Sequence, residues 1–312
     1  MQNRLRQKGV ILGTTGSENG RANHLLAHVC SDQGYDERRS EFEMFKASLM
    51  EEVAALEPQE RLLLTSEAFQ NANPQKVAEI LPYPLHVVVY LREQFAYLLS
   101  SYSQAVHRQR VSLQVSEFEK QRFNPNYERF LNSWERHIPN CSLSVGIYDR
   151  DTLAKGDIRV DFLNAIGLPY MPPEEPQASI RQNLTIGGAI LEFKRRLNAL
   201  PFDHIIAPAM LYLILQKVAF RSPELNRGVN FPPELSERVR GRFQAGNQAV
   251  ASKWFNTDSA LFTHRSIEPV DPELLKAPAL ESVAEQLDRR RSNLGSDLVR
   301  LMLEHGVWVD AT

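Results

Sequence analysis

Polar residues that could take part in catalysis follow each of three apolar runs in this sequence. Ser66 and Glu67 lie at the end of RLLLT, Arg92 follows LHVVVYL, and the segment Asp149–Asp151 follows LSVGIY. Each run is short, rich in valine, leucine or isoleucine, and bounded by charged residues, proline, asparagine or cysteine, which predicts a buried parallel strand. Ligands of open parallel sheets bind at the carboxyl ends of the strands, so these residues are the first candidates for a site.

The elements that must position these residues alternate between strand and helix. Asn73 and Pro74 suit the N-cap and first position of a helix in NPQKVAEIL, and further helical patterns follow the second and third strands. This alternation predicts an α/β fold with right-handed crossovers. The predicted strands cover Arg61–Thr65, Leu85–Leu91 and Leu143–Tyr148.

The second strand end offers a charged donor group with a nearby hydroxyl. Arg92 carries a planar guanidinium that suits a phosphate, and Ser100 lies eight residues further on, in the helix predicted after Arg92. Eight residues make a little over two helical turns, so both side chains can face one crevice if Arg92 reaches forward. The same spacing is equally consistent with a structural role, in which the arginine covers the sheet edge and the serine faces solvent.

The sequence divides near a proline-rich segment, PYMPPEEPQAS, at residues 169–179. Strand patterns precede it and helical patterns dominate after it. We therefore predict an α/β nucleotide-binding-like core over residues 1–170 and a mainly helical part over residues 171–312. The run DRRRSN at residues 288–293 is expected to be a solvated helix face. The predicted C-terminal helices cover Gly188–Leu200, Pro208–Phe220, Pro233–Phe255 and Ala279–Gly306.

Composition limits the class of protein. The chain has 312 residues, 43% hydrophobic content and a formal net charge of −2, which gives no reason to expect a nucleic-acid partner. Two isolated cysteines are too few for a disulfide framework or a zinc site. No apolar run approaches the roughly 20 residues that span a bilayer. We expect a cytoplasmic protein without membrane insertion.

The stretch VVVYLREQFAYLLSSYSQAVHRQ resembles the 3′-phosphate-binding segment of sulfotransferases that use 3′-phosphoadenosine 5′-phosphosulfate (PAPS). LLLTSEAF, YDRDTLAKGDIRVDFLNAIGLP, RQNLTI and NQAVASKWF are similar to stretches of bacterial sulfotransferase-like proteins of polysaccharide pathways. The resemblance spans roughly Gln2 to Phe262. It implies a three-layer parallel sheet of the P-loop sulfotransferase type, PAPS as co-substrate without a metal, and a carbohydrate acceptor. It also implies that Arg92 and Ser100 bind the 3′-phosphate, and that Arg181 and Asn183 close over the nucleotide.

The stretch GVILGTTGSENG only partly matches the family's 5′-phosphosulfate loop. That loop reads Lys-Thr/Ser-Gly-Thr-Thr and leads into a helix, whereas here Ile11 stands at the lysine position and a polar stretch comes next. MQNRLRQKGVIL itself resembles the tail of the family's first helix and the short segment after it. We therefore predict that residues 13–20 form a surface loop and that the phosphosulfate loop lies upstream of Met1 or is absent, which would leave the chain inactive.

Transfer to a hydroxyl needs a general base. Glu67 is the first candidate because it follows a strand and lies in the SE stretch shared with the family, and His24 in ANHLLAH is the second. Glu67 is explained as well by a favourable position at a helix N-terminus, and His24 by a structural role. His107 and Arg108 are expected on a solvated helix face. The alternative is that they line the side of the site where the acceptor binds.

Two other functions remain open from the sequence. The D-x-D pattern of Asp149 and Asp151 after a strand suits a metal-dependent glycosyltransferase, although Asp151 also suits an N-cap. A non-catalytic scaffold derived from the sulfotransferase fold is the third possibility, because the phosphosulfate loop is missing. Metal dependence separates the first of these from sulfuryl transfer, which needs no metal.

Overall fold

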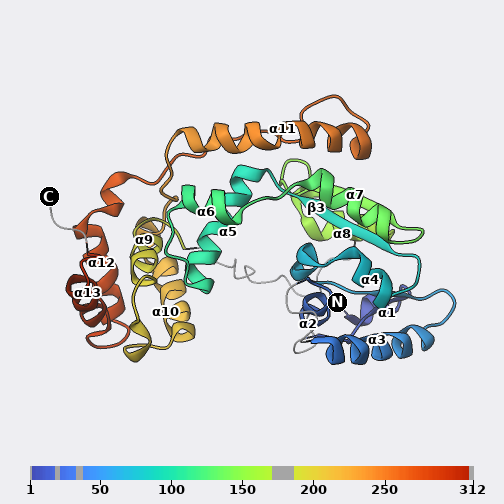
Figure 1. Ribbon diagram of the computed structural model, residues 1–312, viewed down its shortest axis with the longest axis horizontal. Helices are drawn as coiled ribbons and strands as arrows, with labels where there is room; N and C mark the ends of the chain where they lie inside the picture. Colours follow the sequence, from blue (N-terminus) through green and yellow to red (C-terminus); the bar gives the residue numbers. More distant parts are fainter. Residues whose placement is uncertain (1, 18–21, 33–37, 171–185, 309–312) are drawn as a thin grey trace. The chain divides into compact units, whose positions relative to one another are not determined.

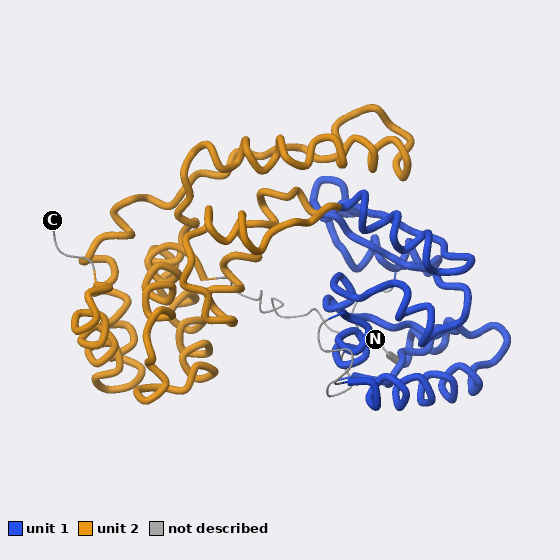
Figure 2. Tube along the Cα trace, in the orientation of Figure 1, with its two compact units in different colours: residues 1–91, 127–176 blue, residues 92–126, 177–312 orange. Residues whose placement is uncertain are grey.

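The computed structural model describes residues 2–17, 22–32, 38–170 and 186–308. These residues form two compact units (Figure 2). The α/β unit comprises residues 1–91 and 127–176, and the helical unit comprises residues 92–126 and 177–312. Each unit has its own hydrophobic core, described separately below.

Within its described residues, the α/β unit contains four short strands with helices on either side of them (Figure 1). Strands β1 and β2 pair in parallel, and strands β3 and β4 form a second parallel pair. The elements are α1 (Gln2–Arg6), β1 (Val10–Leu12), α2 (His24–Val29), α3 (Arg39–Ala54), β2 (Arg61–Leu63), the 3-10 helix η2 (Glu67–Asn71), α4 (Pro74–Ile80), β3 (His86–Leu91), α7 (Tyr127–His137), β4 (Ser142–Ile147), η3 (Ala154–Gly156) and α8 (Ile158–Ala165).

Both pairs of strands are covered by apolar side chains on their two faces. Leu62 of β2 and Val87 of β3 join a cluster with residues of α2, α3, α4 and α7. The next residue in each strand, Leu63 or Val88, joins a second cluster that includes α1 and α8. Successive strand residues point to opposite faces, so this alternation is expected of strands that have apolar neighbours on both sides.

The three strands predicted from apolar runs are confirmed as β2, β3 and β4, and their pairing is parallel. Asn73 also caps α4 as predicted, because its side-chain oxygen accepts from the Gln75 backbone N–H. The resemblance implied one three-layer parallel sheet, whereas the part of the chain that the structure describes has two separate two-stranded pairs. The chain is therefore a mixed α/β protein with small parallel sheets, and β1 is a further short strand that the prediction did not include.

The helical unit begins within the region that the sequence assigned to the α/β core. Residues 92–126 belong to it, because the apolar face of α5 packs on the C-terminal helices. The elements are α5 (Gln94–Gln109), α6 (Val115–Arg122), α9 (Gly188–Leu197), η4 (Phe202–His204), α10 (Pro208–Arg221), η5 (Pro223–Leu225), α11 (Glu234–Phe255), η6 (Pro272–Leu275), α12 (Ala277–Asp288) and α13 (Leu294–Glu304).

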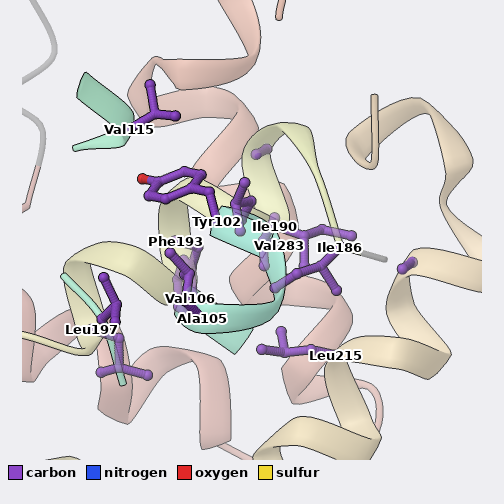
Figure 3. Close-up of a cluster of buried hydrophobic side chains, with 14 of the residues drawn as sticks. Tyr102, Ala105, Val106, Val115, Ile186, Ile190, Phe193, Leu197, Leu215 and Val283 are labelled. Atoms are coloured by element: carbon purple, nitrogen blue, oxygen red, sulfur yellow. The ribbon is translucent and has the colours of Figure 1, made fainter. Parts of the chain in front are cut away.

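The core of the helical unit forms where α5 meets α9 and α12 (Figure 3). Tyr102 and Val106 of α5 lie beside Ile190 and Phe193 of α9, and Val283 of α12 belongs to the same cluster. All five side chains are buried. Burial of a large apolar side chain contributes about 1.5–3 kcal/mol, so this cluster holds α5 firmly in the helical unit.

The last predicted helix is divided in the structure. The chain leaves α12 at Asp288, and α13 begins at Leu294 after a turn in which Asn293 has a φ of 60°. The Asp288 carboxylate accepts from the backbone N–H groups of Gly295 and Ser296, at 2.7 and 3.2 Å. The run DRRRSN is therefore a turn and not a helix face. None of the helices within the described residues combines the length and the apolar character needed to cross a membrane.

Candidate functional site

The carboxyl ends of β1 and β2 are held together by one buried side chain, Asn23. Its amide nitrogen donates to the carbonyl oxygens of Gly13 and Thr15, at 3.0 and 2.9 Å, and its side-chain oxygen accepts from the Thr65 N–H at 2.9 Å. Asn23 is 1% exposed and directly precedes α2. It therefore fixes the loops after both strands relative to the start of that helix.

His24, the first residue of α2, contacts the end of the β2 loop. Its Nδ1 lies 2.7 Å from Ser66 Oγ, and the same oxygen accepts from the Ala68 backbone N–H at 3.0 Å. His24 and Ser66 are half-buried, whereas Glu67 is exposed and begins η2. The structure thus places the two predicted bases close together, since His24 is bonded to the residue next to Glu67. We name the group Asn23, His24, Ser66 and Glu67 the strand-end cluster.

The loop after β1 is occupied by a carboxylate from α3. Glu52 accepts hydrogen bonds from the backbone N–H groups of Thr14 and Thr15, at 2.7 to 3.1 Å, and from both threonine hydroxyls at 2.7 Å. Amide and hydroxyl groups that converge in this way are typical of an oxyanion site. A surface loop was predicted over residues 13–20; residues 13–17 do form a loop, and residues 18–20 lie outside the described residues. Thr15 is nevertheless only 5% exposed, and its backbone N–H and hydroxyl are bonded to Glu52.

We expect Glu52→Gln to lower the stability of the α/β unit at neutral pH by about 1.5–3 kcal/mol, because the acceptor loses its charge and one of its two oxygens is replaced by an NH₂ group that cannot accept. Partial burial alone would raise the pKa of Glu52, but the hydrogen bonds from Thr15 and Thr14 outweigh it and hold the pKa below its usual value. A depressed carboxyl pKa stabilises the fold above the pKa of the unfolded chain, and this stability is lost as pH falls through the folded pKa.

The stability of the wild-type unit should therefore fall with acidification from about pH 5 downwards. This fall should be smaller in Glu52→Gln. Urea unfolding at neutral and acidic pH, followed by the fluorescence of Trp134 in a chain whose Trp254 and Trp308 are replaced by phenylalanine, measures both effects. The exposed neighbour substitution Glu51→Gln is the control. Equal acid sensitivity in wild type and Glu52→Gln would contradict the assignment.

The helical unit contains the second group of predicted site residues, at the start of α5. Arg92 directly follows Leu91, the last residue of β3. Glu93 then caps α5, because one carboxylate oxygen accepts from the Ala96 N–H at 2.8 Å and the other lies 3.2 Å from Arg240 Nε. His264 Nδ1 lies 3.5 Å from the same oxygen. The charge of the cap carboxylate is therefore offset by Arg240 of α11.

A pair of amide side chains fixes the first turn of α5 to α11. Gln94 donates to Asn247 at 2.6 Å, and Asn247 donates back to Gln94 at 3.0 Å. Gln94 is 2% exposed and Asn247 is half-buried, so this reciprocal pair is partly shielded from water. Ser100 lies within α5 and is half-buried. We name Arg92, Glu93, Gln94, Arg240 and Asn247 the helix-start cluster.

Arg92 and Ser100 both belong to the helical unit, whereas His24 and Glu67 belong to the α/β unit. Arg181 and Asn183, which the resemblance placed over the nucleotide, lie outside the described residues.

His107 was predicted on a solvated helix face, but its side chain is buried in the structure. It is 7% exposed, and neither ring nitrogen has a hydrogen-bond partner. Burial and the nearby Lys194 ammonium lower the pKa of His107 to about 4.

The D-x-D segment forms a local turn. Asp149 Oδ1 accepts from the Asp151 backbone N–H at 2.9 Å. Asp151 was predicted as the N-cap directly before TLAKG, but the helical turn there, η3, has Leu153 at its N-cap, so this prediction is wrong. The helix after it, α8, is capped by Asp157, which accepts from the Arg159 N–H. Within the part of the chain that the structure describes, no three His, Cys, Asp or Glu side chains are grouped as a metal site.

The residues that the sequence analysis missed act through distant contacts. Glu52 lies 37 and 38 positions from its threonine partners, and Asn247 lies 153 positions from Gln94. The only local signals were the polar pair Glu93 and Gln94 directly after Arg92, and the position of Asn23 immediately before a helix, which suits an N-cap. Asn23 makes no side-chain cap, and its side chain bonds to the strand loops instead.

Comparisons with known proteins leave the family of this chain open. No family model matches it, and no solved structure matches it. An uncharacterized protein from Archaeoglobus fulgidus is 29% identical over 141 residues. The match covers 44% of this chain and 38% of that protein, so it spans about two fifths of the relative's length.

Proposed function

We propose that this chain has a sulfotransferase-like scaffold that binds a 3′-phosphorylated adenine nucleotide and derives from enzymes that transfer a sulfuryl group from PAPS to a carbohydrate hydroxyl. The proposal treats the two parallel strand pairs as parts of one layer between helices, as in the P-loop sulfotransferase fold. In support, both pairs contribute side chains to the same two apolar clusters.

The observation that carries the proposal is the position of Arg92. It stands at the carboxyl end of the parallel strand β3, and the next helix contains Ser100. The Gln94–Asn247 pair and the Glu93–Arg240 ion pair fix the backbone directly after it. An arginine that emerges from a fixed backbone loses less entropy when it binds a phosphate.

The reaction itself would proceed by displacement at sulfur. A base takes the proton of the acceptor hydroxyl, the hydroxyl oxygen attacks sulfur, and the bond from sulfur to the phosphate oxygen breaks to release adenosine 3′,5′-bisphosphate. His24 can accept a proton at Nε2 only if Nδ1 carries hydrogen and donates it to Ser66 Oγ. That oxygen then accepts from both Nδ1 and Ala68 N–H, which its two lone pairs allow. Glu67 is the alternative base.

A second candidate function, nucleotide binding without turnover, is favoured by Glu52. The donors of the loop after β1 are committed to this carboxylate. Loss of a donor that stabilises the transition state typically costs about 10²–10³ in rate. On this interpretation the chain keeps the contacts to the 3′-phosphate and lacks those that activate the sulfuryl group.

Calorimetric titration with adenosine 3′,5′-bisphosphate tests nucleotide binding. We expect micromolar affinity, and Arg92→Ala should weaken it by about 10- to 150-fold, because a charge-assisted contact contributes about 1.5–3 kcal/mol. Arg150→Ala is the matched control, since Arg150 is an exposed arginine that follows β4. An unchanged affinity of Arg92→Ala would overturn the phosphate assignment.

Sulfuryl transfer is measured separately, with radiolabelled PAPS and a panel of carbohydrate acceptors. Turnover that is lost in His24→Ala and retained in Glu67→Ala would assign the base to His24, and the reverse pattern to Glu67. Binding without turnover would favour the non-catalytic scaffold. A folded wild-type chain that binds no nucleotide would contradict both candidate functions.

A further inference from the structure

His107 lies in the last turn of α5, where this helix contacts α10. Its side chain is 7% exposed, and within the described part of the chain neither ring nitrogen has a hydrogen-bond partner. The ring packs on Tyr212 of α10, with the two ring centroids 4.2 Å apart. Buried polar atoms are normally paired, and a protonated imidazole needs acceptors for two N–H groups. The position therefore suits the neutral ring far better than the charged one.

The charged groups around His107 are mainly positive. Lys194 of α9 is 1% exposed, and its ammonium donates to Asn198 and lies 5.1 Å from the centre of the Phe202 ring. Neither of these partners carries a negative charge. On α5 itself, Arg108 donates to the same tyrosine hydroxyl of α10 at 2.8 Å. The two cations therefore act against a positive charge on His107.

Two features near this cluster could offset such a charge, and both are already engaged. The carboxylate of Asp203 in η4 is bonded to Arg110 at 2.6 and 2.9 Å, and its side chain is 55% exposed. The end of α5 carries partial negative charge, as helix C-termini do. Its Val106 carbonyl oxygen, however, accepts from the Asn198 amide at 2.7 Å. Neither feature is therefore free to compensate a proton on His107.

We propose that the stacking of His107 on Tyr212 is an acid-sensitive switch, which holds α5 against α10 at neutral pH and opens when His107 is protonated. A charged imidazole without an acceptor must reach water, because burial of an unpaired charge is costly. The buried ring reaches water when it separates from Tyr212, whose hydroxyl also accepts from Arg108 of α5. Opening therefore releases the contacts that join the end of α5 to α10, beside the core around Val106 (Figure 3).

The pH range of the switch follows from the surroundings of His107. Burial, Lys194 and Arg108 lower the pKa of His107 from its ordinary value of 6.5 to about 4. A histidine whose pKa is lower in the folded chain contributes stability above the unfolded value, and this stability is lost as pH falls from about 6.5 to about 4. Lys194, whose pKa burial lowers to about 8, is already charged in this range. This inference is independent of the proposed nucleotide site.

Hydrogen–deuterium exchange of the full chain, read by mass spectrometry, tests the switch. After correction for intrinsic exchange rates, peptides from the end of α5 and from α10 should lose about 30-fold in protection between pH 7.5 and pH 5. His107→Phe keeps an aromatic ring against Tyr212 and removes both unpaired nitrogens, so it should fold and lose most of this acid response. His305→Phe is the matched control, because His305 is an exposed histidine of the same unit, and it should keep the full response.

NMR titration of the wild-type chain measures the protonation of His107 without any variant. Its assigned ring Cε1–H signal should show no protonation above about pH 5.5, where an exposed histidine is already largely charged. Protonation of His107 near pH 6.5 in the folded chain would overturn the proposal. So would undiminished protection of α10 at pH 5, or an acid response of His107→Phe equal to that of wild type.

Discussion

Glu192→Ala is expected to destabilise the helical unit by about 3 kcal/mol or more, because it leaves two partly buried arginines without their carboxylate. The Glu192 side chain is 8% exposed, and those of Arg195 and Arg196 are 14% and 20% exposed. Glu192 accepts from Arg195 at 2.7 and 2.8 Å and from Arg196 at 2.7 Å. Arg195 also donates to the Ser112 carbonyl, so the cluster joins α9 to the chain that follows α5.

The pKa of Glu192 supports this expectation. Burial alone would raise it, but the two arginines outweigh burial and hold the pKa below its usual value, so the carboxylate stays ionised in the folded unit. Chemical unfolding of Glu192→Ala, compared with Glu281→Ala, measures the loss. Glu281 is an exposed glutamate of α12, and its removal should change stability by no more than about 0.5 kcal/mol. A loss of under 1 kcal/mol in Glu192→Ala would show that the arginines find other partners.

Strands were more predictable than their assembly. β2, β3 and β4 are half-buried, with apolar side chains packed against both faces, and they read as continuous apolar runs, which is a local signal. The pairing of β1 with β2 depends on three residues of each strand, Val10–Leu12 and Arg61–Leu63. So short a strand has no distinctive pattern, and nothing local specifies whether two strand pairs form one sheet.

The candidate site shows the same limit. Position after a strand identified Ser66, Glu67 and Arg92, because the carboxyl end of a strand is a local property. The partner of Ser66 is His24, 42 positions away, and the partner of the Thr14 hydroxyl is Glu52 on another helix. These contacts follow from how α2 and α3 pack beside the strands. Side chains that meet only through packing leave no pattern in a single sequence.

The turn between α12 and α13 was missed for a related reason. The apolar repeat continues on either side of Asp288–Asn293, so it predicts one long helix. In the structure α12 and α13 pack against each other, and the Asp288 carboxylate bonds to the first turn of α13. A close approach of two helices explains why a glycine stands at position 295.

Gly295→Ala should therefore be among the most damaging small substitutions in this chain. A Cβ at Gly295 would lie 1.9 Å from the Ala284 carbonyl oxygen and 2.5 Å from its carbonyl carbon. Both are backbone atoms of α12, so the added methyl group can be accommodated only if the two helices move apart. Leu280, Leu287 and Leu298 are fully buried in this unit. Overpacking costs typically 1–3 kcal/mol, and we expect about 3 kcal/mol or more where backbone must shift.

Gly241→Ala in α11 is the matched control, because a Cβ at Gly241 meets nothing within 4 Å. Replacing a glycine in an open helix interior reduces the entropy of the unfolded chain, so this variant should gain about 0.5–1 kcal/mol. Urea unfolding followed by circular dichroism compares the two. If the stability change is negative in Gly295→Ala and positive in Gly241→Ala, the loss at Gly295 comes from the contact with Ala284. A Gly295→Ala variant as stable as wild type would contradict the close packing of α12 on α13, and with it the support that α12 gives to α9 and α5.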